Sequence, residues 1–127
     1  MNRPPTLLRT LVLLIAAHSW GVGLCLVLFP GPITRFAGWV DVQPLFFPVQ
    51  AGVFHLVLAT GYVMEYFRLR TIHLLLVAKA TAFLFLTLAT LIADVPWVIP
   101  FSGLADGFMG LAAWYVFKRS SSPLSSS

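Results

Sequence analysis

Four ionisable side chains lie alone inside long apolar stretches of this 127-residue chain: His18, His55, Lys79 and Asp106. Lys79, for example, stands in the run HLLLVAKATAFLFL, residues 73–86. A buried lysine and a buried aspartate are candidates for an ion pair, and a histidine beside them exchanges protons near neutral pH. Such a group is able either to fasten helices together or to bind a ligand and move protons.

The four side chains fall at similar depths if each apolar stretch is a helix that crosses a membrane. Measured from the nearest basic residue at about 1.5 Å per residue, Lys79 and His18 lie about 13 Å in, and Asp106 and His55 about 18–19 Å in. Ionisable side chains at this depth cost roughly 2.5–3.5 kcal/mol each, so they usually face the interior and pair with one another. We therefore predict a buried polar layer of these four residues, in which Lys79 pairs with Asp106.

Two interpretations of this layer remain open. In the first, the Lys79–Asp106 pair sets the register of the helices and the histidines are hydrogen-bonded core residues, since buried ionic groups often specify packing. In the second, the layer binds a quinone- or sterol-like lipid or handles protons, because ionisable residues inside a membrane are functional candidates. Asp106 would then tune Lys79, and a histidine would move protons.

The composition places the chain in a membrane. Hydrophobic residues make up 59% of it and charged residues only 9%, whereas an ordinary soluble domain is about 45–50% apolar and about 25% charged. A soluble fold this small could not hide so much apolar surface. The net charge of +4 does not point to nucleic acid, because the basic residues stand in pairs at the ends of the apolar stretches.

Four segments are long enough to cross the hydrocarbon core, which takes roughly 20 apolar residues in a helix. Lipid offers the backbone no other partner, so each segment should be an α-helix. We predict an all-α, four-helix up-down bundle in a single transmembrane domain over residues 1–119, followed by a disordered tail over residues 120–127. The four predicted spans are residues 7–29, 48–67, 71–93 and 98–117.

The lengths of the loops predict which helices are neighbours. Only residues 68–70 separate the second and third spans, so these two should form a tight antiparallel hairpin. The third and fourth spans are joined nearly as tightly around Asp94 and Pro96. The one sizeable loop, residues 30–47, is expected to fold back along the outer surface.

The distribution of basic residues predicts the orientation in the membrane. With the N-terminus inside, six basic residues fall in the inner segments and only Arg35 in the outer loops. An excess of Lys and Arg marks the cytoplasmic side. Both termini are therefore expected in the cytoplasm, and the protein in the cell inner membrane. The six basic residues are Arg3, Arg9, Arg68, Arg70, Lys118 and Arg119.

Two further features concern contacts between side chains and between helices. Glu65 lies three residues before Arg68, and we predict an interfacial ion pair between them. Glycines inside the spans leave room for another helix to approach closely, which indicates helix contacts. The glycines concerned are Gly21 and Gly23 in the first span, Gly52 in the second, and Gly103, Gly107 and Gly110 in the fourth.

Motifs of familiar enzymes are missing from the sequence. It contains no CxxC, HExxH, GxSxG or glycine-rich phosphate loop. The three histidines lack metal-ligand spacing, so no metal and no cofactor are predicted, and Cys25, the one cysteine, is expected to be a buried, inert thiol. The inner segments are too short for a soluble catalytic domain, so the sequence favours a role other than that of an enzyme.

Glycine-containing motifs mark the first two spans: Gly21-Val-Gly23, FPGPITRFAG at residues 29–38 and QAGVFHLVLATG at residues 50–61. In these motifs the chain resembles the DoxX-like group of small bacterial four-helix membrane proteins. The resemblance implies an accessory membrane subunit, some members of the group being tied to quinone-linked sulfur oxidation, and it assigns no site residue. The chain is also similar in architecture to sterol isomerases and their ligand-binding relatives, which bury carboxylates and a histidine around an apolar pocket.

Together these features predict a small integral membrane protein of accessory or interaction type, with a polar core centred on Lys79 and Asp106. Its partners would be the lipid bilayer and either further copies of itself or a larger membrane complex, reached through lipid-facing glycine and aromatic surfaces. The alternative is a membrane-embedded protein that binds an apolar, lipid-like ligand or handles protons at the four-residue layer.

Overall fold

The computed structural model describes residues 6–122, and within them the protein is all-helical, as predicted. The second predicted span begins two residues earlier and ends two residues later than expected, and the fourth continues to Ser121 rather than ending near Phe117. Residues 120–121, assigned to the disordered tail, are therefore helical, and the remainder of that tail from residue 123 lies outside the described residues. The helices are α1 (Thr6–Leu28), α2 (Pro30–Phe36), α3 (Phe46–Leu69), α4 (His73–Ile92) and α5 (Val98–Ser121).

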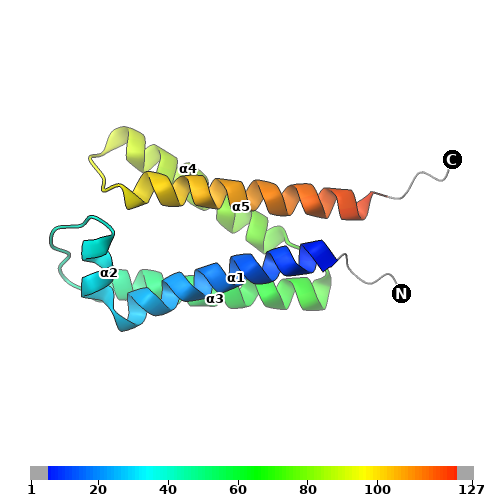
Figure 1. The fold of residues 1–127 in the computed structure, drawn as a ribbon, viewed down its shortest axis with the longest axis horizontal. Helices are drawn as coiled ribbons and strands as arrows, with labels where there is room; N and C mark the ends of the chain where they lie inside the picture. Colours follow the sequence, from blue (N-terminus) through cyan, green and yellow to red (C-terminus); the bar gives the residue numbers. More distant parts are fainter. Residues whose placement is uncertain (1–5, 123–127) are drawn as a thin grey trace.

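The short helix α2 opens the loop that sequence analysis left without structure. Prolines stand at its start, where a missing N–H removes no hydrogen bond within the helix. The Thr34 hydroxyl donates to the carbonyl oxygens of Pro30 and Gly31, at 2.8 and 3.0 Å, and these bonds stabilise the first turn of α2. The loop after the first span thus starts as a helix that lies across one end of the molecule (Figure 1).

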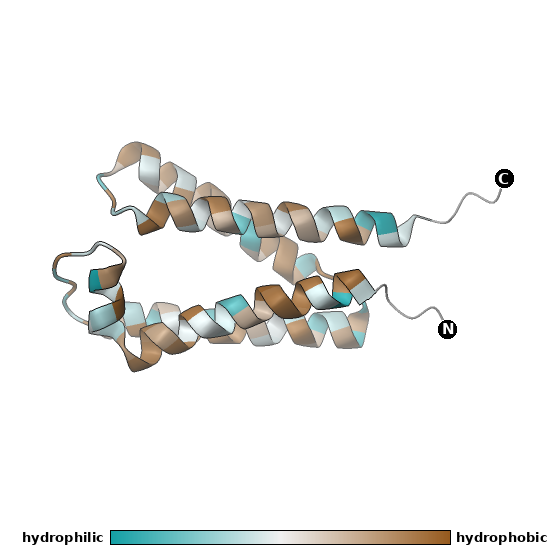
Figure 2. Cartoon of the chain, viewed as in Figure 1, coloured by the Kyte–Doolittle hydropathy of each residue, from teal (hydrophilic) through white to brown (hydrophobic). Residues whose placement is uncertain are grey.

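Three helices, α1, α3 and α4, are long and apolar enough to cross a membrane, which agrees with the predicted membrane location. Helix α5 is as long as α3 but less apolar, because Gly103, Asp106, Gly107 and Gly110 lie within it. Hydrophobic residues, in brown, predominate along all the long helices, and isolated hydrophilic residues interrupt them (Figure 2). Large apolar side chains on their outer faces are widely exposed, as expected for surfaces that lipid covers.

The long helices are arranged as two antiparallel pairs (Figure 1). Helix α1 packs along α3 and α4 packs along α5, whereas contacts between the pairs are few. The predicted tight hairpin of the second and third spans is therefore wrong: α3 and α4 are joined by a short link but make little contact. A short loop brings two helix ends together, but it does not force the helices to pack along their lengths. The predicted pairing of the third and fourth spans is present.

Helices α1 and α3 cross at two glycines that touch each other. A Cβ atom added to Gly23 would lie 2.8 Å from the carbonyl oxygen of Gly52, and one added to Gly52 would lie 2.8 Å from the carbonyl oxygen of Gly23. Only residues without side chains allow two helix backbones to come this close. The crossing of α1 and α3 therefore depends on Gly23 and Gly52.

Helices α4 and α5 fit together through notches on α5. Gly103 faces Leu86 and Gly107 faces Phe83, so that two side chains of α4 sit against bare backbone. The predicted close approach along this glycine strip is confirmed, and its partner lies in the same chain. The strip therefore faces α4. The prediction that these glycines lie on a lipid-facing surface used for association is wrong.

The two pairs meet at both ends of the molecule. At one end a buried cluster joins all four long helices and includes Leu8, Tyr62, Leu75 and Ala113. At the other end the ring of Phe36, from α2, stacks edge-on against Trp97 with centroids 6.0 Å apart. We call the first the basic end, because it carries Arg9, Arg68, Arg70, Lys118 and Arg119, and the second the α2 end.

Candidate functional site

The predicted ion pair is present in the middle of the α4–α5 pair. The Nζ atom of Lys79 donates to Oδ1 of Asp106 at 2.6 Å. The Lys79 side chain is 4% exposed and that of Asp106 is 14% exposed. An isolated charge at this depth is costly, so the short contact offsets the loss of water for both groups.

Glycine positions the lysine. The Cβ atom of Lys79 lies against Gly110, where an added Cβ would come within 3.1 Å of it. Asp106 stands one turn before Gly110 on α5 and therefore on the same face of that helix. The notch at Gly110 lets the lysine stem lie on the α5 backbone, and its ammonium group then reaches Asp106.

His55 is the histidine that the fold brings toward this pair. It is partly buried on α3 and lies close enough to Lys79, Asp106 and His18 to interact with them electrostatically. Tyr62, two turns further along α3, is buried and lies within electrostatic range of Asp106. Tyr62 was not among the predicted site residues, although its spacing from His55 places both on one helix face.

His18 is not enclosed in the layer, and its prediction as a buried residue is wrong. The side chain is exposed on α1. The face of α1 that packs inside the molecule carries Val12, Ile15, Ser19 and Gly23, and His18 lies on the flank of that face. His18 lies within electrostatic range of His55, but the rotation of α1 about its axis turns the His18 side chain outward.

Glu65 binds the start of α4. The ion pair that was predicted between Glu65 and Arg68 is not formed. Its carboxylate accepts hydrogen bonds from the backbone N–H groups of His73 and Leu74, both at 2.9 Å, and from the Thr71 hydroxyl at 2.8 Å. The first N–H groups of a helix lack partners within it and attract negative charge. These donors compete successfully with Arg68, which is exposed in the last turn of α3.

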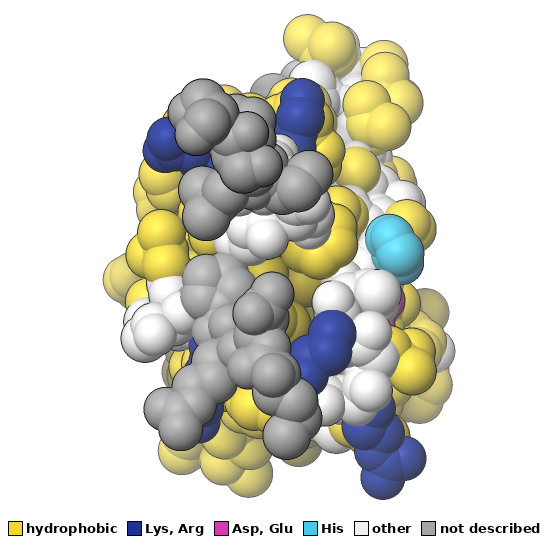
Figure 3. Space-filling model, turned by 90° about the vertical axis from the view of Figure 1, so that its right-hand side faces the viewer, with side chains coloured by type: hydrophobic (Ala, Val, Ile, Leu, Met, Phe, Trp, Pro, Cys, Tyr) yellow, Lys and Arg dark blue, Asp and Glu magenta, His cyan; other side chains and the backbone are white. Residues whose placement is uncertain are grey.

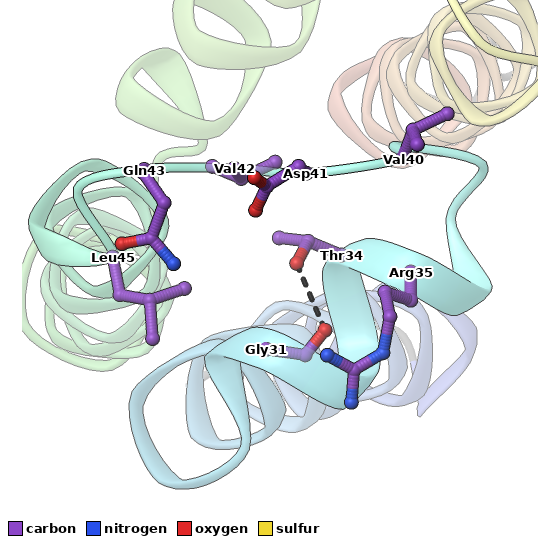
Figure 4. A pocket seen from close by; sticks show the side chains of 8 residues that line it. All are labelled: Gly31, Thr34, Arg35, Val40, Asp41, Val42, Gln43 and Leu45. Carbon is purple, nitrogen blue, oxygen red and sulfur yellow. Dashed lines mark hydrogen bonds between the residues drawn. The ribbon is translucent and has the colours of Figure 1, made fainter.

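A pocket at the α2 end is lined by several polar side chains (Figure 4). Thr34 and Arg35 contribute from α2, and Asp41 and Gln43 from the loop that follows. Thr34 is buried and bonded to the backbone of α2, whereas Arg35, Asp41 and Gln43 are exposed. The pocket lies outside the membrane-crossing segments and contains none of the predicted layer.

No group of three or more His, Cys, Asp or Glu residues within the described range is arranged to hold a metal ion.

Cys25 was expected to be buried, but its side chain is exposed on α1. The residues two positions before and after it, Gly23 and Val27, face α3, so Cys25 points away from that helix.

No protein family, curated protein or solved structure was found that matches this chain. The resemblance to the DoxX-like group therefore stays a proposal.

Proposed function

We propose that this chain is a four-span integral membrane protein of accessory or interaction type, in which the Lys79–Asp106 pair holds α4 against α5. The observation that carries the proposal is the enclosure of the pair within the helix contact. The Lys79–Asp106 interaction is thus made inside the α4–α5 pair, and the outer faces of the long helices expose mainly apolar side chains. Buried ionic pairs of this kind serve to specify packing.

Helix α5 is proposed as the fourth span because it lies along α4, which is itself long and apolar enough to cross a membrane. The residues that lower its hydropathy, Gly103, Asp106, Gly107 and Gly110, face α4 and not lipid. Its outer face carries exposed apolar side chains from Phe101 to Tyr115. Residues hidden against a neighbouring helix add no cost of contact with lipid, so α5 is suited to the membrane despite its composition.

We further propose that both termini are cytoplasmic and that the protein resides in the inner membrane. The basic end carries five of the basic residues in the described range, and Arg35 lies in α2 at the other end. In a Cys25→Ser background, a single cysteine at Ser122 should react with a membrane-impermeant maleimide only after permeabilisation. A cysteine at Gln43 should react in intact cells or spheroplasts. The opposite labelling pattern would contradict the proposed orientation.

Association can be tested on the full chain extracted from its membrane with a copolymer that retains surrounding lipid. Native mass spectrometry should then find the 14.0 kDa chain mainly in particles of greater protein mass. Coexpression of two differently tagged copies separates self-association from binding to another subunit. Recovery of the chain as a monomer alone would contradict the accessory role.

A second function, the binding of a lipid-like ligand or the handling of protons, is favoured by one observation. His55, partly buried on α3, lies within electrostatic range of Lys79 and Asp106, and Asp106 is the more exposed partner of the pair. The same native spectra distinguish this function, because a ligand adds a small-molecule mass instead of a protein mass. That mass should disappear in a folded Lys79→Met/Asp106→Leu variant if the layer binds the ligand.

A further inference from the structure

The basic end of the molecule carries Lys and Arg side chains among hydrophobic ones (Figure 3), and some of these cations lie over aromatic rings. The Arg9 guanidinium lies 5.6 Å from the centre of the Phe67 ring. Lys118 lies 5.1 Å from the centre of the Trp114 ring, on the other helix pair. Contacts of this kind hold cations close to the aromatic belt of a membrane interface.

No carboxylate of residues 6–122 forms an ion pair with these cations. Glu65, the acidic residue nearest to the end of α3, accepts three hydrogen bonds from the start of α4. The ion pairs found in residues 6–122 are those of Lys79 with Asp106 and of His73 with Glu65. The five cations of the basic end are therefore available to an anion from outside the chain.

A buried hydroxyl group marks one part of this end. The Tyr66 side chain is 1% exposed, and its hydroxyl has no hydrogen-bond partner among the described residues. The Tyr66 ring packs edge-on against Phe67, the ring on which Arg9 lies, with centroids 5.3 Å apart. The backbone N–H of Arg70 donates to the Tyr66 carbonyl oxygen at 3.1 Å, so both arginines lie next to this tyrosine. A buried hydroxyl without an acceptor is costly, so an acceptor oxygen beside Arg9 and Arg70 would stabilise the group.

We propose that Arg9, Arg70 and the Tyr66 hydroxyl bind the phosphodiester group of an anionic phospholipid. A phosphodiester supplies a negative charge and acceptor oxygens that suit the guanidinium fork. A lipid is favoured over a free phosphate because the exposed apolar residues Leu7 and Leu69 stand next to the two arginines in sequence and offer a surface for acyl chains. Basic groups between helices at the cytoplasmic face are known to suit anionic headgroups.

The test is a native mass spectrometry titration of the purified full chain in detergent with dioleoylphosphatidylglycerol, dioleoylphosphatidylcholine or inorganic phosphate. The wild type should bind the glycerol lipid at least about tenfold more tightly than the choline lipid. The variant Arg9→Gln/Arg70→Asn should lose roughly 10- to 30-fold in that affinity. Asparagine is chosen at position 70 because φ there is 58°, in the left-handed region that asparagine tolerates.

A matched control removes the same charge elsewhere at the basic end. Lys118→Gln/Arg119→Gln should keep the lipid affinity close to the wild-type value, because these side chains contact Trp114 and Tyr115 on the other pair. Tyr66→Phe, which removes only the hydroxyl, should weaken binding about fivefold. If Arg9→Gln/Arg70→Asn does not fold, Arg9→Lys/Arg70→Lys replaces it and should bind more weakly than wild type, since lysine lacks the guanidinium fork.

Several outcomes would overturn the proposal. Equal losses in the two double variants would show diffuse attraction to an anionic surface. Equal binding of inorganic phosphate and the lipid would show a site for a free anion, and an unaffected Tyr66→Phe variant would remove the hydroxyl from the site. The inference needs only that α1 and α3 cross the membrane. It can fail while the chain still associates in native particles, so it is separable from the proposed function.

Discussion

Replacing Lys79 with methionine should destabilise the protein by roughly 3 kcal/mol, because the carboxylate of Asp106 then stays buried without its partner. Methionine keeps a stem of similar length against Gly110, so the loss reports the charge and not the packing. Asp106→Leu should cost less, since the long lysine side chain can turn toward the basic end, whereas the short aspartate cannot reach water. Unfolding in mixed micelles titrated with SDS, followed by circular dichroism, measures both effects.

The double variant Lys79→Met/Asp106→Leu is the decisive comparison. With both charges removed, stability should return to within about 1 kcal/mol of the wild type, because an apolar pair can fill the same space without a desolvation cost. Lys118→Met serves as the control, since that lysine is exposed at the basic end and should change stability by no more than about 0.5 kcal/mol. Losses that simply add in the double variant would show that the two residues stabilise the protein independently.

Replacing Gly23 with alanine should separate α1 from α3 and destabilise the protein by about 1–3 kcal/mol. The added methyl group would lie 2.8 Å from a backbone oxygen of Gly52, and a backbone atom cannot move aside as a side chain can. Gly52→Ala should have a similar effect, because it fills the same contact from the other helix. The thermal midpoint in a mild detergent, read from tryptophan fluorescence, measures the loss.

Gly21 provides a matched control on the same helix. No atom lies within 4 Å of the position that its Cβ would occupy. Gly21→Ala should therefore leave the midpoint unchanged or raise it slightly, since alanine favours the helix by about 1 kcal/mol over glycine in helical peptides. Equal destabilisation by Gly21→Ala and Gly23→Ala would mean that the α1–α3 crossing does not depend on the contact between glycines.

The helices themselves could be predicted well from the sequence. The predicted spans at residues 7–29 and 71–93 correspond to α1 at Thr6–Leu28 and α4 at His73–Ile92, with differences of no more than two residues. The length of an apolar run is a local property, and lipid leaves an apolar backbone only the helix to satisfy its hydrogen bonds. Helix α2 was missed because its seven residues, with two prolines, carry no periodic apolar pattern.

The candidate site could be predicted only in part. The position of a residue along a helix follows from residue counting. This counting predicted the ion pair of Lys79 with Asp106, which is present. Exposure depends on rotation about the helix axis, which residue counting does not determine, and His18 was therefore misplaced. Glu65 was misassigned for another reason: its true partners are backbone N–H groups at the start of α4, and spacing between side chains does not reveal them.

The sequence by itself determined that the chain forms long apolar helices, three of which the structure shows to be long and apolar enough to cross a membrane, and that isolated ionisable residues lie within the apolar segments. Each of these properties depends on the transfer of one segment from water into lipid, which its own composition decides. Only the tertiary structure decided that α1 packs with α3 and α4 with α5, and which faces meet. The choice of partner depends on close contacts at a few positions, such as Gly23 with Gly52 and Lys79 with Gly110, and these arise only when distant segments come together.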